Sequence, residues 1–150
     1  MRILFLDIDG VLINRSDYAS RRPGAERVAL LNRLLAVTGA RIVISSSHRI
    51  GKNRIQMCDI FNDWGVTPGL ILDLTPVINS SDSHAVEIAA WLKHREERCN
   101  DVENFVVIDD DLSDMHDFLP QLIQTTKADG LTSELVDKAV GMLVSKTAVD

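Results

Sequence analysis

The sequence predicts a single α/β domain of three layers, in which a mainly parallel sheet is covered by helices on both faces, as in Rossmann-like folds. Short apolar runs alternate along the chain with longer segments whose apolar residues recur at helical spacing. Such alternation is typical of βαβ units, which bury a parallel sheet between helices. Neither an internal repeat nor an interdomain linker interrupts the pattern, so we expect one domain over residues 1–150.

Short apolar runs mark the expected strands. The first covers residues 3–6, and its short length before Gly10 is typical of a buried strand. The same reasoning predicts four later strands, at residues 41–44, 70–74, 105–108 and 122–125.

The segments between these runs carry the expected helices. They cover residues 25–37 and 51–64, a segment capped by Asp82 or Ser83 that ends at residues 100–101, and a segment after residues 130–132. Gly39 is expected to end the first helix. Trp64 and Trp91 follow the apolar pattern of their helices, so we expect both in the core.

The composition indicates a globular protein and excludes some functions. With 150 residues, 45% of them hydrophobic and 25% charged, the chain is long enough for a real core. A net charge of −6 argues against a broadly basic surface that would hold nucleic acid by counterion release. No apolar run approaches the ~20 residues of a membrane span, and Cys58 and Cys99 lack the spacing of a metal site. We therefore expect a cytoplasmic protein with free thiols and no membrane partner.

Polar side chains follow three of the expected strands at the point where each strand ends. Asp7 and Asp9 follow the first, serines at 45–47 follow the second, and Asp109 and Asp110 follow the fourth. Because the carboxyl ends of parallel strands lie at one edge of a sheet, these groups should converge. Alternation along a strand would direct Asp7 and Asp9 to the same side. Two buried carboxylates need a cation between them, so we expect a divalent metal here, with hydroxyls and backbone N–H groups holding an anion.

The order of these motifs resembles that of the haloacid dehalogenase-like (HAD) phosphatase superfamily. Residues 7–12, Asp-Ile-Asp-Gly-Val-Leu, resemble its first motif, and residues 44–45 and 106–110 resemble its second and fourth. The chain is most similar to small members without a cap domain that occur in RNA-repair proteins. The shared stretches are residues 5–12, 46–49 and 130–132. The resemblance implies one HAD-like phosphatase domain over residues 1–150, with no cap.

The resemblance also implies a catalytic mechanism. Asp7 would attack a phosphoryl group and form an aspartyl phosphate. Asp9 would protonate the leaving oxygen and then take a proton from water. Ser45, or Ser46 if the register shifts by one residue, would donate a hydrogen bond to the phosphoryl oxygens.

A Mg²⁺ ion is the implied cofactor. It would be held by Asp7, by the backbone carbonyl of Asp9 and by Asp109 or Asp110, and it would reduce the repulsion between an anionic nucleophile and an anionic substrate. Further contacts to the substrate are expected from Gly10, Ser47 and Lys52.

The third motif of the superfamily departs from its usual form in this chain. It is usually a Lys or Arg just before a helix, and that position here holds His84. Histidine has an unperturbed pKa of about 6.5, which nearby acids would raise. Arg49, as a bidentate phosphate donor, or Lys52 is the alternative source of the positive charge. A non-catalytic phosphate-binding module therefore remains an alternative to the phosphatase.

The gaps between the motifs leave no room for a cap domain, so the site should be open. An open site accepts a phosphate on a bulky carrier more easily than it encloses a small metabolite. We expect a 3′- or 5′-phosphorylated end of RNA or DNA, with a nucleotide or a phosphoprotein as the alternatives. The candidates to receive a nucleic-acid chain are Arg15, Arg21, Arg22 and Arg49. A phospho-receiver domain also has acids at strand ends, but its phosphoacceptor lies on a later strand than residue 7.

Overall fold

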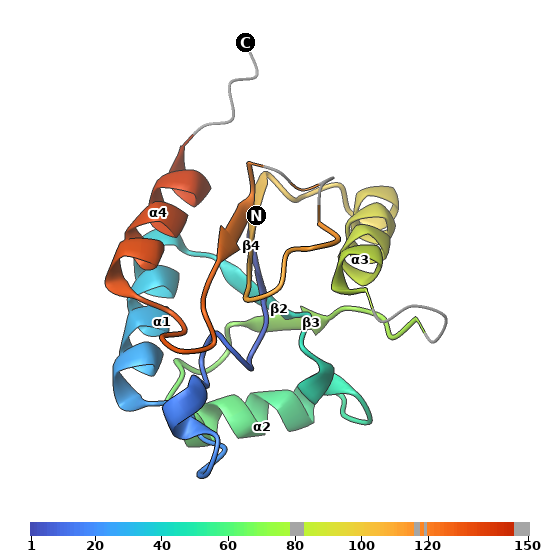
Figure 1. Ribbon diagram of the computed structural model, residues 1–150. Helices are drawn as coiled ribbons and strands as arrows, with labels where there is room; N and C mark the ends of the chain where they lie inside the picture. Colours follow the sequence, from blue (N-terminus) through green and yellow to red (C-terminus); the bar gives the residue numbers. More distant parts are fainter. Residues whose placement is uncertain (79–82, 116–117, 119, 146–150) are drawn as a thin grey trace.

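A computed structural model describes residues 1–78, 83–115, 118 and 120–145. Within these residues, five strands form one sheet in the order β3-β2-β1-β4-β5, and every neighbouring pair is parallel (Figure 1). The strands are β1 (Arg2–Leu6), β2 (Arg41–Ile44), β3 (Ile71–Leu74), β4 (Asn104–Asp109) and β5 (Leu122–Gln124). The parallel α/β architecture predicted from the apolar runs is confirmed.

The helices lie close to their predicted positions. They are α1 (Ala25–Thr38), α2 (Arg54–Trp64), α3 (His84–Arg98) and α4 (Ser133–Val144), with short 3₁₀ turns η1 (Arg15–Asp17) and η2 (Ser47–Arg49). The prediction that α2 starts at residue 51 is wrong, because Asn53 caps the helix through a reciprocal pair of hydrogen bonds with Gln56. Ser83 caps α3 by accepting from the Val86 amide, whereas Asp82 lies outside the described residues.

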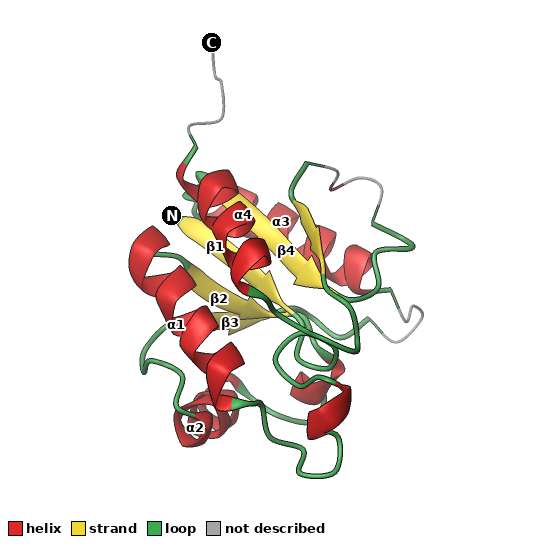
Figure 2. Ribbon diagram, turned by 60° about the vertical axis from the view of Figure 1, so that its left-hand side comes forward, coloured by secondary structure: helices red, strands yellow, loops and turns green. Residues whose placement is uncertain are grey.

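Alternate side chains of β1 supply the two layers of the core. Leu4 and Leu6 pack in the cluster that α1, α2 and α4 cover, whereas Ile3 and Phe5 pack in the cluster that α3 covers. Figure 2 shows the sheet between these layers, and in Figure 1 α1 and α4 lie on one side of it and α3 on the other. The predicted three-layer arrangement is therefore confirmed.

The two tryptophans lie where their helical patterns place them. Trp91 is 5% exposed and meets Phe5 edge to face, with ring centroids 5.4 Å apart. Trp64 is half-buried and packs on Phe61 at 5.2 Å. The Trp91 contact joins α3 to β1, whereas Trp64 and Phe61 both lie on α2.

The connections leave the carboxyl edge of the sheet uncovered by a second domain. Among the described residues, only a loop with η1 and then α1 lie between β1 and β2, and only η2 and α2 lie between β2 and β3. The prediction that the domain has no cap is therefore confirmed for the part of the chain that the structure describes. No helix there is long and apolar enough to cross a membrane.

Candidate active site

Asp7 lies at the end of the central strand, beside the end of β4. Its backbone N–H donates to the Ile108 carbonyl at 3.1 Å, which extends the β1–β4 pairing by one residue. The carboxylate is 6% exposed. Ligand atoms of Asp7, Asp109 and His84 all lie within 4.8 Å of one another. The predicted convergence of the first and fourth strand ends is confirmed by this cluster.

Hydrogen bonds fix the Asp109 carboxylate at both of its oxygens. Oδ2 lies 2.9 Å from Nδ1 of His84, the first residue of α3, and Oδ1 accepts from the Asp111 amide at 3.0 Å. The side chain is almost fully buried. The start of α3 therefore sets the orientation of the second carboxylate in the cluster.

The electrostatics of the cluster favour a bound cation. Burial and the charge of Asp109 raise the pKa of Asp7 to about 8. Burial and a contact with Asp109 also raise the pKa of Asp110. Burial opposes ionisation of Asp109 as well, but its hydrogen bonds with His84 and the Asp111 amide lower its pKa overall. The hydrogen bond between His84 and Asp109 also raises the pKa of His84. Three carboxylates that cannot easily ionise together form an oxygen-rich site suited to a hard divalent cation.

Gly10 lets the chain turn tightly against Asp110. Its φ is +80°, and a Cβ atom there would lie 2.6 Å from Cγ and Oδ2 of Asp110. The turn is tied to the end of β5, because Thr125 Oγ1 donates to the Gly10 carbonyl at 2.5 Å. The Leu131 amide also donates to the Val11 carbonyl at 2.8 Å. Gly10 is therefore a backbone requirement of the site.

Asp9 has different surroundings from Asp7 and is not part of the described cluster of Asp7, His84 and Asp109. The strand ends at Leu6, and the amides of residues 11–13 all donate to the Ile8 carbonyl. Alternation holds only within an extended strand, so it no longer directs Asp9. The Asp9 side chain is 58% exposed and lies 3.0 Å from Nε2 of His48.

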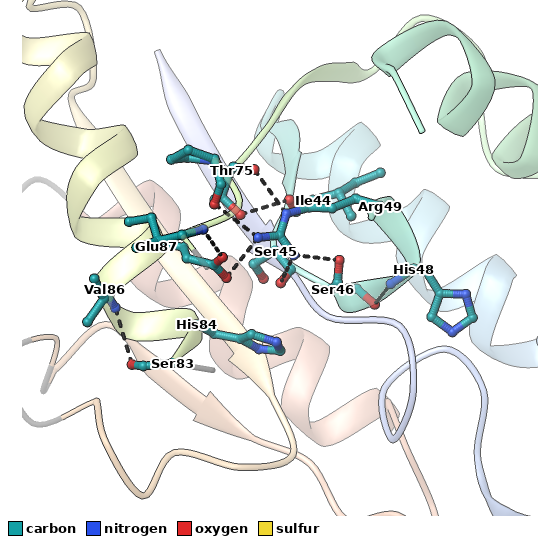
Figure 3. Close-up of polar contacts among 12 residues, drawn as sticks. Ile44, Ser45, Ser46, His48, Arg49, Thr75, Ser83, His84, Val86 and Glu87 are labelled. Carbon is teal, nitrogen blue, oxygen red and sulfur yellow. Dashed lines mark hydrogen bonds and ion pairs between the residues drawn. The ribbon is translucent and has the colours of Figure 1, made fainter. Parts of the chain in front are cut away.

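The N–H donors of Arg49 are engaged within the protein, in a network that the sequence did not reveal (Figure 3). The guanidinium is almost fully buried and forms an ion pair of 2.7 Å with Glu87 on α3. Its remaining donors reach four backbone carbonyls, at residues 45, 46, 75 and 76. The expected phosphate contact is therefore replaced by a positioning role, in which Arg49 joins the loop after β2 to the loop after β3.

The three serines differ in what their hydroxyls contact. Ser45 is fully buried, and its Oγ has no hydrogen-bond partner among the described residues. Ser46 Oγ accepts from the His48 amide and so caps η2, whereas Ser47 is exposed. A buried hydroxyl without a partner is the kind of group that a bound anion satisfies.

A cleft of about 520 Å³ opens over the acidic cluster. The residues that line it are Asp7, Ser83, His84, Asp109, Asp110, Asp111, Ser113, Asp114 and Lys127. Lys52 is not among them, since its Nζ donates to the His48 carbonyl at 3.0 Å. Neither Arg49 nor Lys52, the two alternatives for the positive charge of the third motif, lines this cleft.

Lys127 is the site residue that the sequence reasoning missed. Its Nζ lies 3.7 Å from Oδ2 of Asp110, and its side chain is 63% exposed. The residue follows β5, whose carboxyl end lies at the same edge of the sheet as the ends of β1, β2 and β4. Because the carboxyl ends of parallel strands lie at one edge of the sheet, the position of Lys127 just after β5 was the signal that could have predicted it.

Comparison with known proteins gives one match. A family model described as the HAD domain in Swiss Army Knife RNA repair proteins matches residues 3–136. No curated protein and no solved structure matched the chain. The matched residues run from β1 into α4 and include the acidic cluster.

Proposed function

We propose that this chain, which belongs to the family of HAD domains found in Swiss Army Knife RNA repair proteins, is a Mg²⁺-dependent phosphomonoesterase. Membership of this family gives the chain a phosphatase-type or phosphate-binding role. The observation that carries the finer proposal is the cluster of Asp7, Asp109 and His84 within 4.8 Å. A carboxylate at the end of the central strand, beside a second fixed carboxylate with which it could share a metal ion, supports this proposal.

Asp7 is the proposed nucleophile. One of its carboxylate oxygens forms a bond to phosphorus while the bond from phosphorus to the ester oxygen breaks. Asp9 gives a proton to the departing oxygen, and it then takes a proton from the water that attacks the aspartyl phosphate. His48, 3.0 Å from the Asp9 carboxylate, holds that side chain in place.

Mg²⁺ fits the donor set of the cluster. Carboxylates of Asp7, Asp109 and Asp110 and the backbone carbonyl of Asp9 are its proposed ligands. When bound, the ion would neutralise charge on the carboxylates and on the phosphoryl oxygens. The raised pKa of Asp7 supports this assignment, because a carboxyl group that resists ionisation alone gains most from a cation.

His84 and Lys127 are the proposed sources of positive charge for the phosphoryl group. The bond with Asp109 raises the pKa of His84, which favours its charged form near neutral pH. Lys127 lines the same cleft, next to Asp110. Ser45, with its unpartnered buried hydroxyl, is the proposed hydrogen-bond donor to the phosphoryl oxygens.

The proposed substrate is a phosphorylated end of RNA or DNA. Two observations support it: the described connections after β1 and β2 contain no cap domain, and the matched family is described from RNA repair proteins. Without a covering domain, the phosphate of a long chain can reach Asp7. Nucleotides and phosphoproteins are the alternatives that the experiment must separate.

The test is turnover of 3′- and 5′-phosphorylated oligonucleotides, free nucleotides and glycerol 2-phosphate, with and without Mg²⁺. We expect Mg²⁺-dependent release of phosphate, with kcat/KM highest for the oligonucleotides. Asp7→Asn should abolish turnover, whereas Asp63→Asn, the same change at an exposed acid on α2, should not. Turnover that persists in Asp7→Asn would exclude Asp7 as the nucleophile.

A non-catalytic phosphate-binding module is the second candidate function. The observation that favours it is that Asp9 pairs with His48, while Arg49 has no free donor for phosphate. Mg²⁺-dependent turnover by the wild-type protein would rule this candidate out. Binding of phosphate ends without any turnover would support it.

A further inference from the structure

We propose that a second cleft, beside Asp9, binds the nucleotide that carries the reacting phosphate, with its base against Tyr18 and the adjacent phosphodiester at Arg21. This inference rests on the proposed function, because it names what occupies the leaving-group side of the same site. The cleft has a volume of about 350 Å³. Its lining residues are Asp9, Ile13, Tyr18, Arg21, His48 and Lys127.

Lys127 joins this cleft to the one over the acidic cluster. It is the residue that lines both. Asp9 and its partner His48 line only the second cleft, and in Figure 3 His48 points away from the Arg49 network. A leaving group that departs from phosphorus as Asp7 attacks, and that takes a proton from Asp9, would therefore enter the second cleft. The cleft is on the leaving-group side of the reaction.

Tyr18 forms an aromatic wall of this cleft, and hydrogen bonds fix the backbone that leads to it. The side chain is 45% exposed and makes no ring contact with another aromatic residue among those described. It follows η1, which Asn14 caps and which the Arg15 amide ties to the Lys127 carbonyl at 2.8 Å. Ile13, 2% exposed, is the apolar residue that lines the cleft with it. An exposed ring with an apolar neighbour is a surface on which a nucleobase stacks.

Arg21 supplies positive charge without a competing partner. Its backbone is fixed by a bond from its amide to the Asp17 carbonyl at 2.9 Å, and its guanidinium has no ion pair within the described part of the chain. Its neighbour Arg22 differs, because it is paired with Asp63 at 2.6 Å and does not line the cleft. Of these two arginines, only Arg21 is available to receive a phosphodiester.

The combination of groups favours a nucleotide over a phosphopeptide. A nucleotide within a chain presents a flat ring and a second phosphate close to the reacting one, which match Tyr18 and Arg21. A phosphoserine peptide offers neither, and a phosphotyrosine offers the ring without the second anion. The cleft volume falls at the lower end of the range for small-molecule sites, which suits a single nucleotide.

The experiment compares kcat/KM for dinucleotides phosphorylated at either end, for the same compounds lacking the terminal base, and for glycerol 2-phosphate. We expect wild-type protein to prefer the complete dinucleotide over its abasic form by about tenfold or more, the size that stacking on an aromatic side chain supplies. Tyr18→Ala should abolish this preference, and Tyr18→Phe should keep it. Arg21→Ala should raise KM for the dinucleotide more than for a mononucleotide, whereas Arg22→Ala should change neither.

The outcomes separate this inference from the proposed function. If no phosphomonoester is turned over, the proposed function fails, and the same variants are then compared by fluorescence anisotropy for binding of a labelled phosphorylated oligonucleotide. Equal binding by wild type and Tyr18→Ala would overturn the inference. If glycerol 2-phosphate is hydrolysed but base removal changes nothing, or a phosphopeptide is preferred, the phosphatase stands and the nucleotide cleft is refuted.

Discussion

Arg49 and Glu87 form an almost fully buried ion pair, with Nη2 2.7 Å from Oε1, that joins the segment after β2 to α3. Glu87 also accepts from the Ile78 amide at 3.0 Å. The pair therefore holds together three segments that border the site: the serines after β2, the loop after β3 and the first turn of α3, where His84 lies.

Arg49→Ala should lower the free energy of unfolding strongly, by about 3–5 kcal/mol, because it leaves Glu87 buried without its partner. Urea denaturation measures this loss. The control is Arg22→Ala, which removes an exposed pair and should cost less than about 1 kcal/mol. A variant that kept its stability but bound phosphate weakly would instead make Arg49 a substrate ligand.

Gly10→Ala should lose both stability and activity. A side chain at φ +80° is strained, and its Cβ would also collide with the Asp110 carboxylate. Gly51→Ala is the matched control, since Gly51 has φ +78° but open space around its Cα. Strain alone should destabilise both variants by about 1 kcal/mol or more. We expect a larger loss for Gly10→Ala, together with reduced phosphatase activity, and equal losses in the two variants would contradict a tight contact with Asp110.

Lys127→Ala should raise KM for phosphorylated substrates by about tenfold, because it removes a positive charge that lines both clefts. Lys127→Arg should keep most of the affinity. Lys138→Ala, the same change at an exposed position on α4, serves as the control for net charge. The KM of each variant for glycerol 2-phosphate and for an oligonucleotide gives the measurement. An unchanged KM for both substrates in Lys127→Ala would remove this residue from the site.

The metal-free protein should be destabilised by ionisation of Asp7. The pKa of this carboxyl is raised to about 8 in the folded state. Its contribution to the free energy of unfolding is therefore fully present below the unfolded pKa of 3.8 and is lost as the pH rises through about 8. Asp7→Asn, which cannot ionise, should therefore have the same free energy of unfolding as wild type near pH 4. Near pH 8 its free energy of unfolding should be higher than that of wild type by a few kcal/mol, the size of effect that such a pKa shift implies.

Denaturation in EDTA across this pH range tests the expectation. Added Mg²⁺ should reduce or reverse the advantage of Asp7→Asn at pH 8, because the ion binds the carboxylate that the variant lacks. A pH-independent difference between the two proteins would mean that Asp7 does not titrate in this range.

The fold could be predicted because its determinants are local. Apolar runs and helical spacing located all five described strands and the four helices, and the misplaced start of α2 reflects a cap that only the Asn53–Gln56 pair reveals. The convergence of Asp7 with Asp109 followed from a general property of parallel sheets.

The parts of the site that could not be predicted depend on contacts between distant segments. The direction of Asp9 is set by the turn that gathers three amides on the Ile8 carbonyl, not by strand alternation. The role of Arg49 depends on Glu87, which α3 brings to it across the loop after β3. No local pattern in the sequence contains either relationship.

The bond from Thr125 to the Gly10 carbonyl has a consequence for biosynthesis. β1 is translated before its neighbour β4 and before the residues that secure its terminal turn, which follow roughly a hundred residues later. The nascent chain must therefore keep β1 unpaired on that side until β4 and the residues around Thr125 and Leu131 have been translated. Contacts so remote along the chain slow folding, and they leave the central strand vulnerable to aggregation while translation proceeds.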